Sequence, residues 1–313
     1  MKRSRWSRIL RGLLLGAVLA LLVCAGVNAV LTASERRSLV PEGVRVAVGG
    51  KSMNVLVTGT GEQTVVLLSG YGTNAPALDF APLVAALSEQ YRVAVVEPFG
   101  YGYSDITEEP RSVENITEEI HEALRLSGIS EYILMPHSLS GIYALYYVHR
   151  YPAEVTAIAG MDTSVQNQLS HVKMPPVGVQ GSILAASGVL RLATKLSPEM
   201  VAPQSDDPAY TPEVLRDIRL LTIRNFNNPS LRDESAWFTQ NFAAMDSMVF
   251  PKDVPVLLFL SSQSVGEKEW WLAEHEAQLE QLDKSKLVVM DGGHYLHWTH
   301  AREMAGELIA FLS

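Results

Sequence analysis

Residues 131–152 read EYILMPHSLSGIYALYYVHRYP, in which a strand-like run, a tight corner and a helix-like segment follow one another directly. The apolar run Tyr132–Met135 has the composition of a buried strand, and Ile142–Arg150 has that of a helix. The corner between them is Pro136–Gly141. A serine on a sharp strand-to-helix turn is presented at the carboxyl end of a sheet, beside the amides that begin the helix. We therefore predict that Ser138 is a nucleophile for acyl transfer.

The composition is that of an ordered globular protein. The 313 residues are 47% hydrophobic and can bury one large core. The net charge of −9 is poorly suited to neutralising phosphates, so nucleic acid is not an expected partner. The only cysteine, Cys24, excludes an intramolecular disulfide and a cysteine-rich metal site.

The N-terminus predicts a membrane-spanning helix. Five basic residues lie within the first eleven, and the uncharged stretch Gly12–Ala33 follows, with Asn28 and Thr32 as its only strongly polar side chains. About 20 apolar residues span a hydrocarbon core, and positive charge before them holds the N-terminus in the cytoplasm. We expect residues 1–33 to form a cytoplasmic tip and a single-pass anchor in the cell membrane, with the rest of the chain outside the cytoplasm.

A cleaved signal peptide is the competing interpretation of this segment, and it would make the protein secreted. Val27-Asn28-Ala29 is a candidate cleavage site. The apolar run is longer than a typical signal-peptide core, which favours the uncleaved anchor. A lipid attachment at Cys24 is disfavoured because Val23 is large where a small residue is expected.

After a polar tether at residues 34–43, strand-like and helix-like segments alternate. This alternation indicates an α/β fold with a mostly parallel central sheet flanked by helices. The expected strands are Val44–Val48, Met53–Val57, Thr64–Leu68, Arg92–Val96, Tyr132–Met135, Val155–Met161, Pro255–Leu260 and Leu287–Met290. The expected helices are Leu78–Leu87, Val113–Leu126, Ile142–Arg150, one near Glu267–Leu282 and one from Ala301 to the end.

Ser164–Pro251 interrupts this alternation. It contains several prolines and helical patches at Ile183–Leu196 and Pro212–Ile223. We interpret it as a helical cap inserted between two strands, over the carboxyl edge of the sheet where ligand sites of open α/β sheets lie. The expected domains are then a core of residues 44–163 and 252–313 and a cap of residues 164–251.

A serine hydroxyl needs a nearby base, which is itself oriented by a third group. The segment Met290–His294 follows the last expected strand, and its two glycines allow an imidazole to reach across the sheet edge. We therefore predict that His294 is the general base for Ser138 and later the acid that protonates the leaving group. The developing oxyanion requires fixed amide donors, which we assign to Leu139 and Tyr71.

At this point the chain from about residue 44 to 313 resembles the α/β-hydrolase fold superfamily. Four ordered motifs carry the resemblance: Ser69–Gly72 for the oxyanion loop, Glu97–Ser104 for the turn after the next strand, Pro136–Gly141 for the nucleophile elbow, and Gly293-His294 for the base. The resemblance implies a cap domain and no cofactor.

The elbow departs from the usual Gly-x-Ser-x-Gly pattern, because Pro136 and Ser140 occupy the two glycine positions. Small flanking residues permit the strained turn and the close packing of strand on helix. Ser140 is small, and Pro136 requires only an extended backbone with no donor.

The position of the acid also departs from the family. An aspartate often follows the strand that corresponds to Pro255–Leu260, and here Ser264 stands about where it would fall. Asp162, after the preceding strand, is the preferred replacement, since some members carry the acid there. Glu267 is the alternative acid, and Glu269, a neutral partner or no partner are the remaining options.

Two further histidine patterns have simpler interpretations. His294, His297 and His300 form an H-x-x-H-x-x-H series, but no paired acid or cysteine accompanies it, so no metal site is expected. His137, beside the nucleophile, should point away from it and pack beneath the elbow.

The sequence thus predicts a membrane-anchored serine hydrolase that acts on a small or medium carboxylic ester, without metal or cofactor. Hydrolysis of amide, lactone or carbon–carbon bonds is an alternative because it uses similar groups. A noncatalytic surface binding protein that kept the fold after losing its acid is the rival hypothesis. Dehalogenation would require an aspartate where Ser138 stands.

Overall fold

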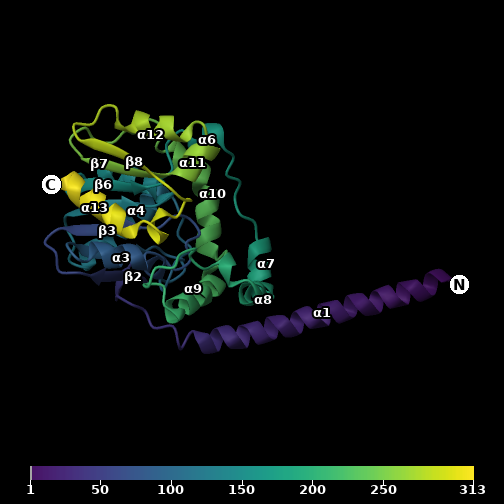
Figure 1. Ribbon diagram of the computed structural model, residues 1–313. Coiled ribbons are helices and arrows are strands. Elements are labelled where there is room, and N and C mark those ends of the chain that lie inside the picture. Colours follow the sequence, from purple (N-terminus) through teal and green to yellow (C-terminus); the bar gives the residue numbers. More distant parts are fainter. Residues whose placement is uncertain (1) are drawn as a thin grey trace.

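The computed structural model describes residues 2–313. Met1 and the side chains of residues 2–5, all within the predicted cytoplasmic tip, lie outside the described part. The centre is an eight-stranded sheet with the strand order β1-β2-β4-β3-β5-β6-β7-β8 (Figure 1). The strands are β1 Val44–Val48, β2 Lys51–Thr58, β3 Thr64–Leu68, β4 Arg92–Glu97, β5 Tyr132–Pro136, β6 Val155–Met161, β7 Val256–Ser261 and β8 Ser285–Met290.

The sheet is mostly parallel, as predicted. Only the edge formed by β1 and β2 pairs antiparallel, β1 with β2 and β2 with β4. The other neighbours are parallel. Every expected strand is present, and its ends lie within two residues of the expected ones. The predicted fold class is therefore confirmed.

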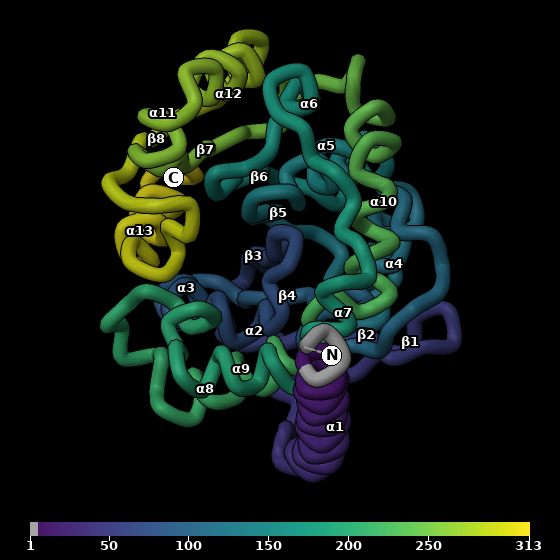
Figure 2. The backbone as a smooth tube through the Cα atoms, turned by 90° about the vertical axis from the view of Figure 1, so that its right-hand side faces the viewer, coloured from purple at the N-terminus to yellow at the C-terminus, as the bar shows by residue number. Residues whose placement is uncertain are grey.

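Helices cover both faces of the sheet, so β3, β5 and β7 are buried along their whole length. On one face, α3 (Ala81–Leu87) and α13 (Ala301–Leu312) close one part of the core. On the other face, α4 (Val113–Leu126) and α5 (Ser140–Arg150) close the larger part. Figure 2 shows these two pairs of helices on opposite sides of the strands.

Two predicted helices are wrong in their bounds. The helix expected at Leu78–Leu87 is divided into α2 (Pro76–Asp79) and α3, because Pro82, in the first turn of α3, has no amide hydrogen with which to continue α2. The helix expected near Glu267–Leu282 is replaced by α11 (Ser262–Glu267) and α12 (Trp271–Leu279). The hydroxyl of Ser261 caps α11 by accepting from the amide of Ser264, which starts that helix earlier.

The long segment between β6 and β7 is helical. It comprises α6 (Gln168–His171), α7 (Gln180–Ala186), α8 (Val189–Leu196), the 3-10 turn η1 (Pro198–Met200), α9 (Pro212–Asn225) and α10 (Pro229–Ala243). The patch expected at Ile183–Leu196 is broken at Gly188, which has a φ of +80°. The sequence analysis did not predict α10, although Asn228 caps it and Pro229 begins it.

Helix α10 is fixed to the core by a buried carboxylate. Both oxygens of Glu234 accept phenolic hydrogen bonds, from Tyr101 at 2.6 Å and from Tyr143 at 2.8 Å. Tyr101 follows β4 and Tyr143 lies on α5, so one side chain joins the insertion to two core elements. Burial raises the pKa of Glu234 above its ordinary value, and the two tyrosine hydrogen bonds oppose this only in part.

The N-terminal helix α1 (Lys2–Glu35) extends away from the rest of the molecule (Figure 1). By length and composition, its stretch Trp6–Glu35 is the one helix in the described residues that could cross a membrane, with a mean hydropathy of 2.5. The helix continues two residues into the expected tether, in which Leu39 is buried in a cluster with Tyr103 and Tyr210.

The raised pKa of Glu234 has a consequence for stability. Between its ordinary pKa of 4.5 and its raised folded value, the folded protein binds the extra proton, so stability falls as the pH rises through this window. We expect the unfolding free energy of Glu234→Gln, relative to wild type, to be higher at about pH 8 than at about pH 4.5, because the glutamine has no proton to lose. Urea unfolding of both proteins at the two pH values measures this gain, with the exposed Glu276→Gln as the control. A difference that does not change with pH would contradict the prediction.

Candidate active site

The turn between β5 and α5 holds Ser138 in a strained conformation. Its φ is +54°, a region that residues other than glycine seldom occupy. The amide of Ser138 donates to the carbonyl of Met161 on β6 at 3.1 Å, and its own carbonyl accepts from the amide of Ser164 at 2.9 Å. These bonds hold the half-buried serine at the carboxyl ends of β5 and β6.

The two unusual residues of the elbow both fit their positions. Ser140 accepts from the amide of His137 at 2.9 Å, and its hydroxyl lies 2.9 Å from the carbonyl of Leu68 on β3. Pro136 is the last residue of β5, where its extended backbone continues the strand. Gly141 is still required, because a Cβ there would lie 2.5 Å from the Cβ of Thr163.

The structure brings His294 to a carboxylate at the same sheet edge. Nδ1 of His294, in the loop after β8, lies 2.6 Å from Oδ2 of Asp162, in the loop after β6. Its ring contacts that of His137, with the centroids 4.7 Å apart, so the imidazole lies against the elbow. With Nδ1 engaged by a carboxylate, Nε2 is the ring nitrogen left for proton transfer.

Asp162 is fully buried and is surrounded by donors. Besides His294, it accepts from the amide of Ser261 at 3.1 Å, the hydroxyl of Ser264 at 2.6 Å and the indole of Trp271 at 2.9 Å. Burial acts to raise the pKa of Asp162, but these hydrogen bonds and the imidazole outweigh it and hold the pKa below its ordinary value. The carboxylate is therefore ionised at neutral pH.

Ser264 stands where the family often has its acid. In this structure its hydroxyl donates to the carboxylate of Asp162 and so supports the acid after the preceding strand. The sequence analysis missed this contact and that of Trp271, because nothing in either side chain indicates which carboxylate it meets. The serine-rich run after β7 is the only signal that could have suggested donors at this edge.

Two backbone amides lie free beside the elbow. Among the described residues, neither the amide of Tyr71 nor that of Leu139 donates to another group. Their loops approach closely, since a Cβ on Gly70 would lie 2.7 Å from the Cβ of Ser138. Two unpaired donors beside a serine can stabilise negative charge that develops on a bound acyl group.

The other candidate residues lie elsewhere or have other partners. Glu267 is exposed and accepts from Gln263 at 2.7 Å, while Asp162 holds the contact with His294. His137 is buried beneath the elbow, as expected, and its Nε2 lies 3.1 Å from the carbonyl of His294.

The histidine series is not gathered around one point. His297 is buried and pairs with Asp79 at 2.7 Å, and His300 contacts the hydroxyl of Thr299. Within residues 2–313 as described, no group of three side chains is arranged to hold a metal ion.

A cavity of about 460 Å³ lies next to the oxyanion loop and the loop that holds the base. Gly72 and Tyr295, the chain neighbours of Tyr71 and His294, form part of its wall. Apolar side chains of the insertion, including Leu184 and Leu190, form another part. The space is of the size that small-molecule sites occupy.

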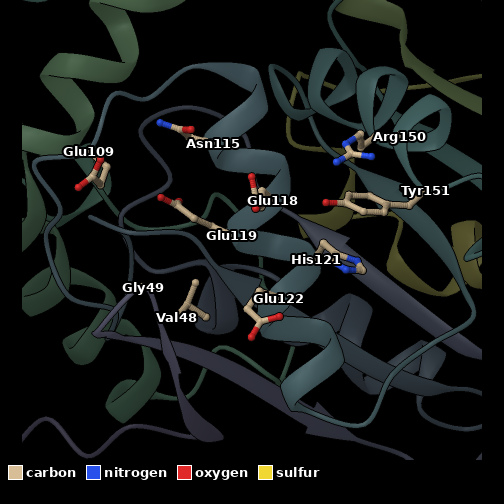
Figure 3. A pocket seen from close by; sticks show the side chains of 10 residues that line it. All are labelled: Val48, Gly49, Glu109, Asn115, Glu118, Glu119, His121, Glu122, Arg150 and Tyr151. Carbon is tan, nitrogen blue, oxygen red and sulfur yellow. The ribbon is translucent and has the colours of Figure 1, made fainter.

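A second cavity, of about 510 Å³, lies away from these residues. Figure 3 shows Glu118, Glu119 and Glu122 of α4 around it, with Arg150 and Tyr151 at the end of α5. Because α5 begins at the elbow and ends at this cavity, about 16 Å of helix separates the two. The second cavity therefore has no part in the candidate site.

Comparisons with known proteins identify the family. A profile of the alpha/beta hydrolase fold matches residues 63–301. YbdG of Bacillus subtilis (strain 168), described as uncharacterized, is 33% identical over 235 residues, which are 72% of this chain and 70% of YbdG. RutD of Escherichia coli O17:K52:H18, named as a candidate carbamate hydrolase, is 25% identical over 238 residues, 75% of this chain and 82% of RutD.

A solved structure shows the same fold. The enol-lactonase from Burkholderia xenovorans LB400 superposes with a TM-score of 0.59 at 19% identity, over 86% of this chain and 99% of that one. Since the family profile matches most of the sequence, the predicted resemblance is confirmed, and the chain belongs to the alpha/beta hydrolase fold family, a family of hydrolytic enzymes.

Proposed function

We propose that the protein is a serine hydrolase that cleaves carboxylic esters through an acyl-enzyme, with Ser138, His294 and Asp162 as its catalytic triad. The observation that carries the proposal is the 2.6 Å contact between Nδ1 of His294 and the buried carboxylate of Asp162. The preceding residue, Met161, accepts the hydrogen bond from the amide of Ser138, so the acid and the serine are held at the same sheet edge.

Each group has one role in this mechanism. The hydroxyl oxygen of Ser138 attacks the acyl carbon while Nε2 of His294 takes its proton, and ionised Asp162 stabilises the imidazolium. The amides of Tyr71 and Leu139 bind the oxyanion. The imidazolium then protonates the leaving alkoxide, and a water molecule, activated by the same imidazole, releases the acid and restores Ser138.

The rival hypothesis of a noncatalytic binding protein depended on a missing acid. Asp162 supplies an ionised carboxylate in contact with His294, which supports an enzyme instead. An ester is the favoured substrate, and a lactone is the closest variant, because an alcohol leaving group requires only the proton that His294 carries. Amide and carbon–carbon bonds demand stronger activation of the leaving group.

The arrangement of the chain supports two further parts of the proposal. Residues 164–251 serve as the cap, with Leu184 and Leu190 lining the cavity near the oxyanion loop. Helix α1 serves as a membrane anchor, with the catalytic domain outside the cytoplasm because the basic residues precede the apolar stretch.

The role of Ser138 is tested with a fluorophosphonate probe, which reacts with activated serines. We expect the probe to label wild type and to leave Ser138→Ala unlabelled, since the variant lacks the attacking oxygen. Ser140→Ala is unsuitable as the control because its hydroxyl supports the elbow, so the exposed Ser313→Ala serves instead. Equal labelling of wild type and Ser138→Ala would reject the proposed nucleophile.

The choice of acid is tested by two isosteric amides. We expect Asp162→Asn to lower kcat for p-nitrophenyl butyrate about 10³- to 10⁴-fold, because the amide would no longer orient and stabilise the imidazolium. Glu267→Gln should remain within about twofold of wild type, since among the described residues the carboxylate of Glu267 bonds only Gln263. Comparable losses in both variants, with unchanged thermal unfolding, would refute the assignment.

Ser264 should support the charge of Asp162. We expect Ser264→Ala to lose about 1–3 kcal/mol of unfolding free energy at pH 7, because a buried carboxylate loses a donor. The pKa of Asp162 is lower in the folded protein than its ordinary value of 3.8, so the ionised carboxylate stabilises the fold above pH 3.8. This stabilisation is lost as the pH falls through the folded pKa. The loss should therefore shrink towards pH 3 in urea unfolding. Ser262→Ala, which bonds exposed Asp291, is the control, and a loss independent of pH would argue against the role.

A further inference from the structure

The apolar helix α1 is bound to the insertion through three polar side chains of its C-terminal part. Arg191 of α8 donates to Oδ1 of Asn28 at 2.7 Å and to the hydroxyl of Thr32 at 2.8 Å, and it pairs with Glu35 at 2.7 Å. Asn28 in turn donates to the carbonyl of Ala185 on α7 at 3.1 Å. Both polar interruptions of the apolar run are thus satisfied by the hairpin of α7 and α8, residues 180–196.

The turn of the hairpin contacts α1 within its apolar run. The turn of the hairpin lies against Cys24 and Asn28, since a Cβ on Gly188 would lie 3.1 Å from each of them. These residues precede the end of the apolar run, Ala33, by nine and five positions. At 1.5 Å per residue, the turn lies about 8 to 14 Å below that end. If α1 spans the bilayer, as proposed above, this level is inside the acyl-chain region of one leaflet.

The outer face of the hairpin has the side chains that such a position requires. Ile183, Leu192 and Leu196 are exposed to 65%, 57% and 75% of their surface. In a chain with a net charge of −9, residues 164–198 contain Lys173, Arg191 and Lys195 and no Asp or Glu. An apolar face with basic residues beside it is typical of helices that lie in a lipid interface.

Both views agree on the placement. Figure 1 shows α7 and α8 on the side of the molecule from which α1 leaves, and Figure 2, which looks along α1, shows α7 directly beside it. The same hairpin contributes Leu184 and Leu190 to the wall of the cavity near the oxyanion loop. The hairpin therefore contacts both the cavity and α1.

We infer that the α7–α8 hairpin is seated in the lipid leaflet beside α1, so that the cavity lined by Gly72 and Tyr295 receives a lipid-borne acyl ester directly from the bilayer. The occupant of the apolar face is lipid, because the face continues the surface of a helix proposed to span the same membrane. The substrate part rests on the proposed ester hydrolysis, while the seating in lipid depends only on the anchor. Cleavage after Ala29 would remove Asn28 from the protein, and Arg191 would keep its contact with Thr32 but lose that with Asn28. The inference therefore also requires an intact α1.

The seating is tested with full-length protein in vesicles of phosphatidylcholine and phosphatidylglycerol. In a Cys24→Ser background, single cysteines at Leu192 and Leu196 carry an NBD fluorophore, and Leu126, an exposed leucine of α4, provides the matched control site. We expect lipids with a nitroxide on the acyl chain to quench NBD at the two hairpin sites at least threefold more than at the control. Iodide in the buffer should quench chiefly the control.

Quenching by iodide at 192 and 196 to the level of the control would overturn the inference. Energy transfer between differently labelled copies, without lipid quenching, would assign the face to a second copy of the chain and would overturn it too. Neither outcome depends on catalysis, so this test stands apart from that of the proposed function.

The substrate part is tested by a double variant, Leu192→Gln/Leu196→Gln. We expect hydrolysis of monoolein in vesicles to fall at least tenfold, while hydrolysis of p-nitrophenyl acetate in buffer remains within twofold. Equal effects on both esters would reject delivery from the bilayer. Wild type could show lipid quenching at the hairpin and yet hydrolyse neither ester. That result would support the seating of the hairpin in lipid, and it would reject both the lipid substrate and the proposed ester hydrolysis.

Discussion

The carboxylate of Asp162 is the group on which the arrangement of the site depends. Removing an ionised carboxylate from water is unfavourable unless hydrogen bonds replace its hydration. Here an amide, two hydroxyls, an indole and an imidazole surround it. These donors come from β7, α11, α12 and the loop after β8, so satisfying one charge fixes the relative positions of four segments. The imidazole of His294 is oriented as one part of that network.

The sheet explains how residues so distant in the chain converge. Ser138, Asp162 and His294 follow β5, β6 and β8, and parallel strands end at the same edge. The buried faces of the strands leave no freedom of register, because a shift by one residue would expose the core. The strained φ of Ser138 is held by bonds to β6, which the same register provides. Catalytic geometry and core packing therefore have a common origin.

The insertion between β6 and β7 connects the site to the N-terminal helix. Glu234 attaches α10 to the core through two tyrosines, and Arg191 attaches α8 to α1 through three side chains. The insertion also contributes apolar side chains to the wall of the cavity near the oxyanion loop. One inserted segment therefore contacts the core, the N-terminal helix and this cavity.

Much of this protein follows from local patterns in its sequence. Runs of apolar residues determine the strands, since only burial on both faces accommodates them, and the short corner around Ser138 determines the elbow. The loop with two glycines before His294 indicates the candidate base, because it gives the imidazole the freedom to reach across the sheet edge. Asp162 could be proposed as the preferred acid, but local sequence left Glu267 open as the alternative because each follows a neighbouring strand.

Tertiary structure alone decided between those carboxylates. Which acid faces the imidazole depends on the path of α11, which turns Glu267 to solvent and directs Ser264 at Asp162. The contacts of Arg191 with α1 join residues more than 150 positions apart, and no periodicity records such a pairing. Local sequence specifies backbone conformation and burial, whereas the partners of a polar side chain are set by the three-dimensional meeting of segments.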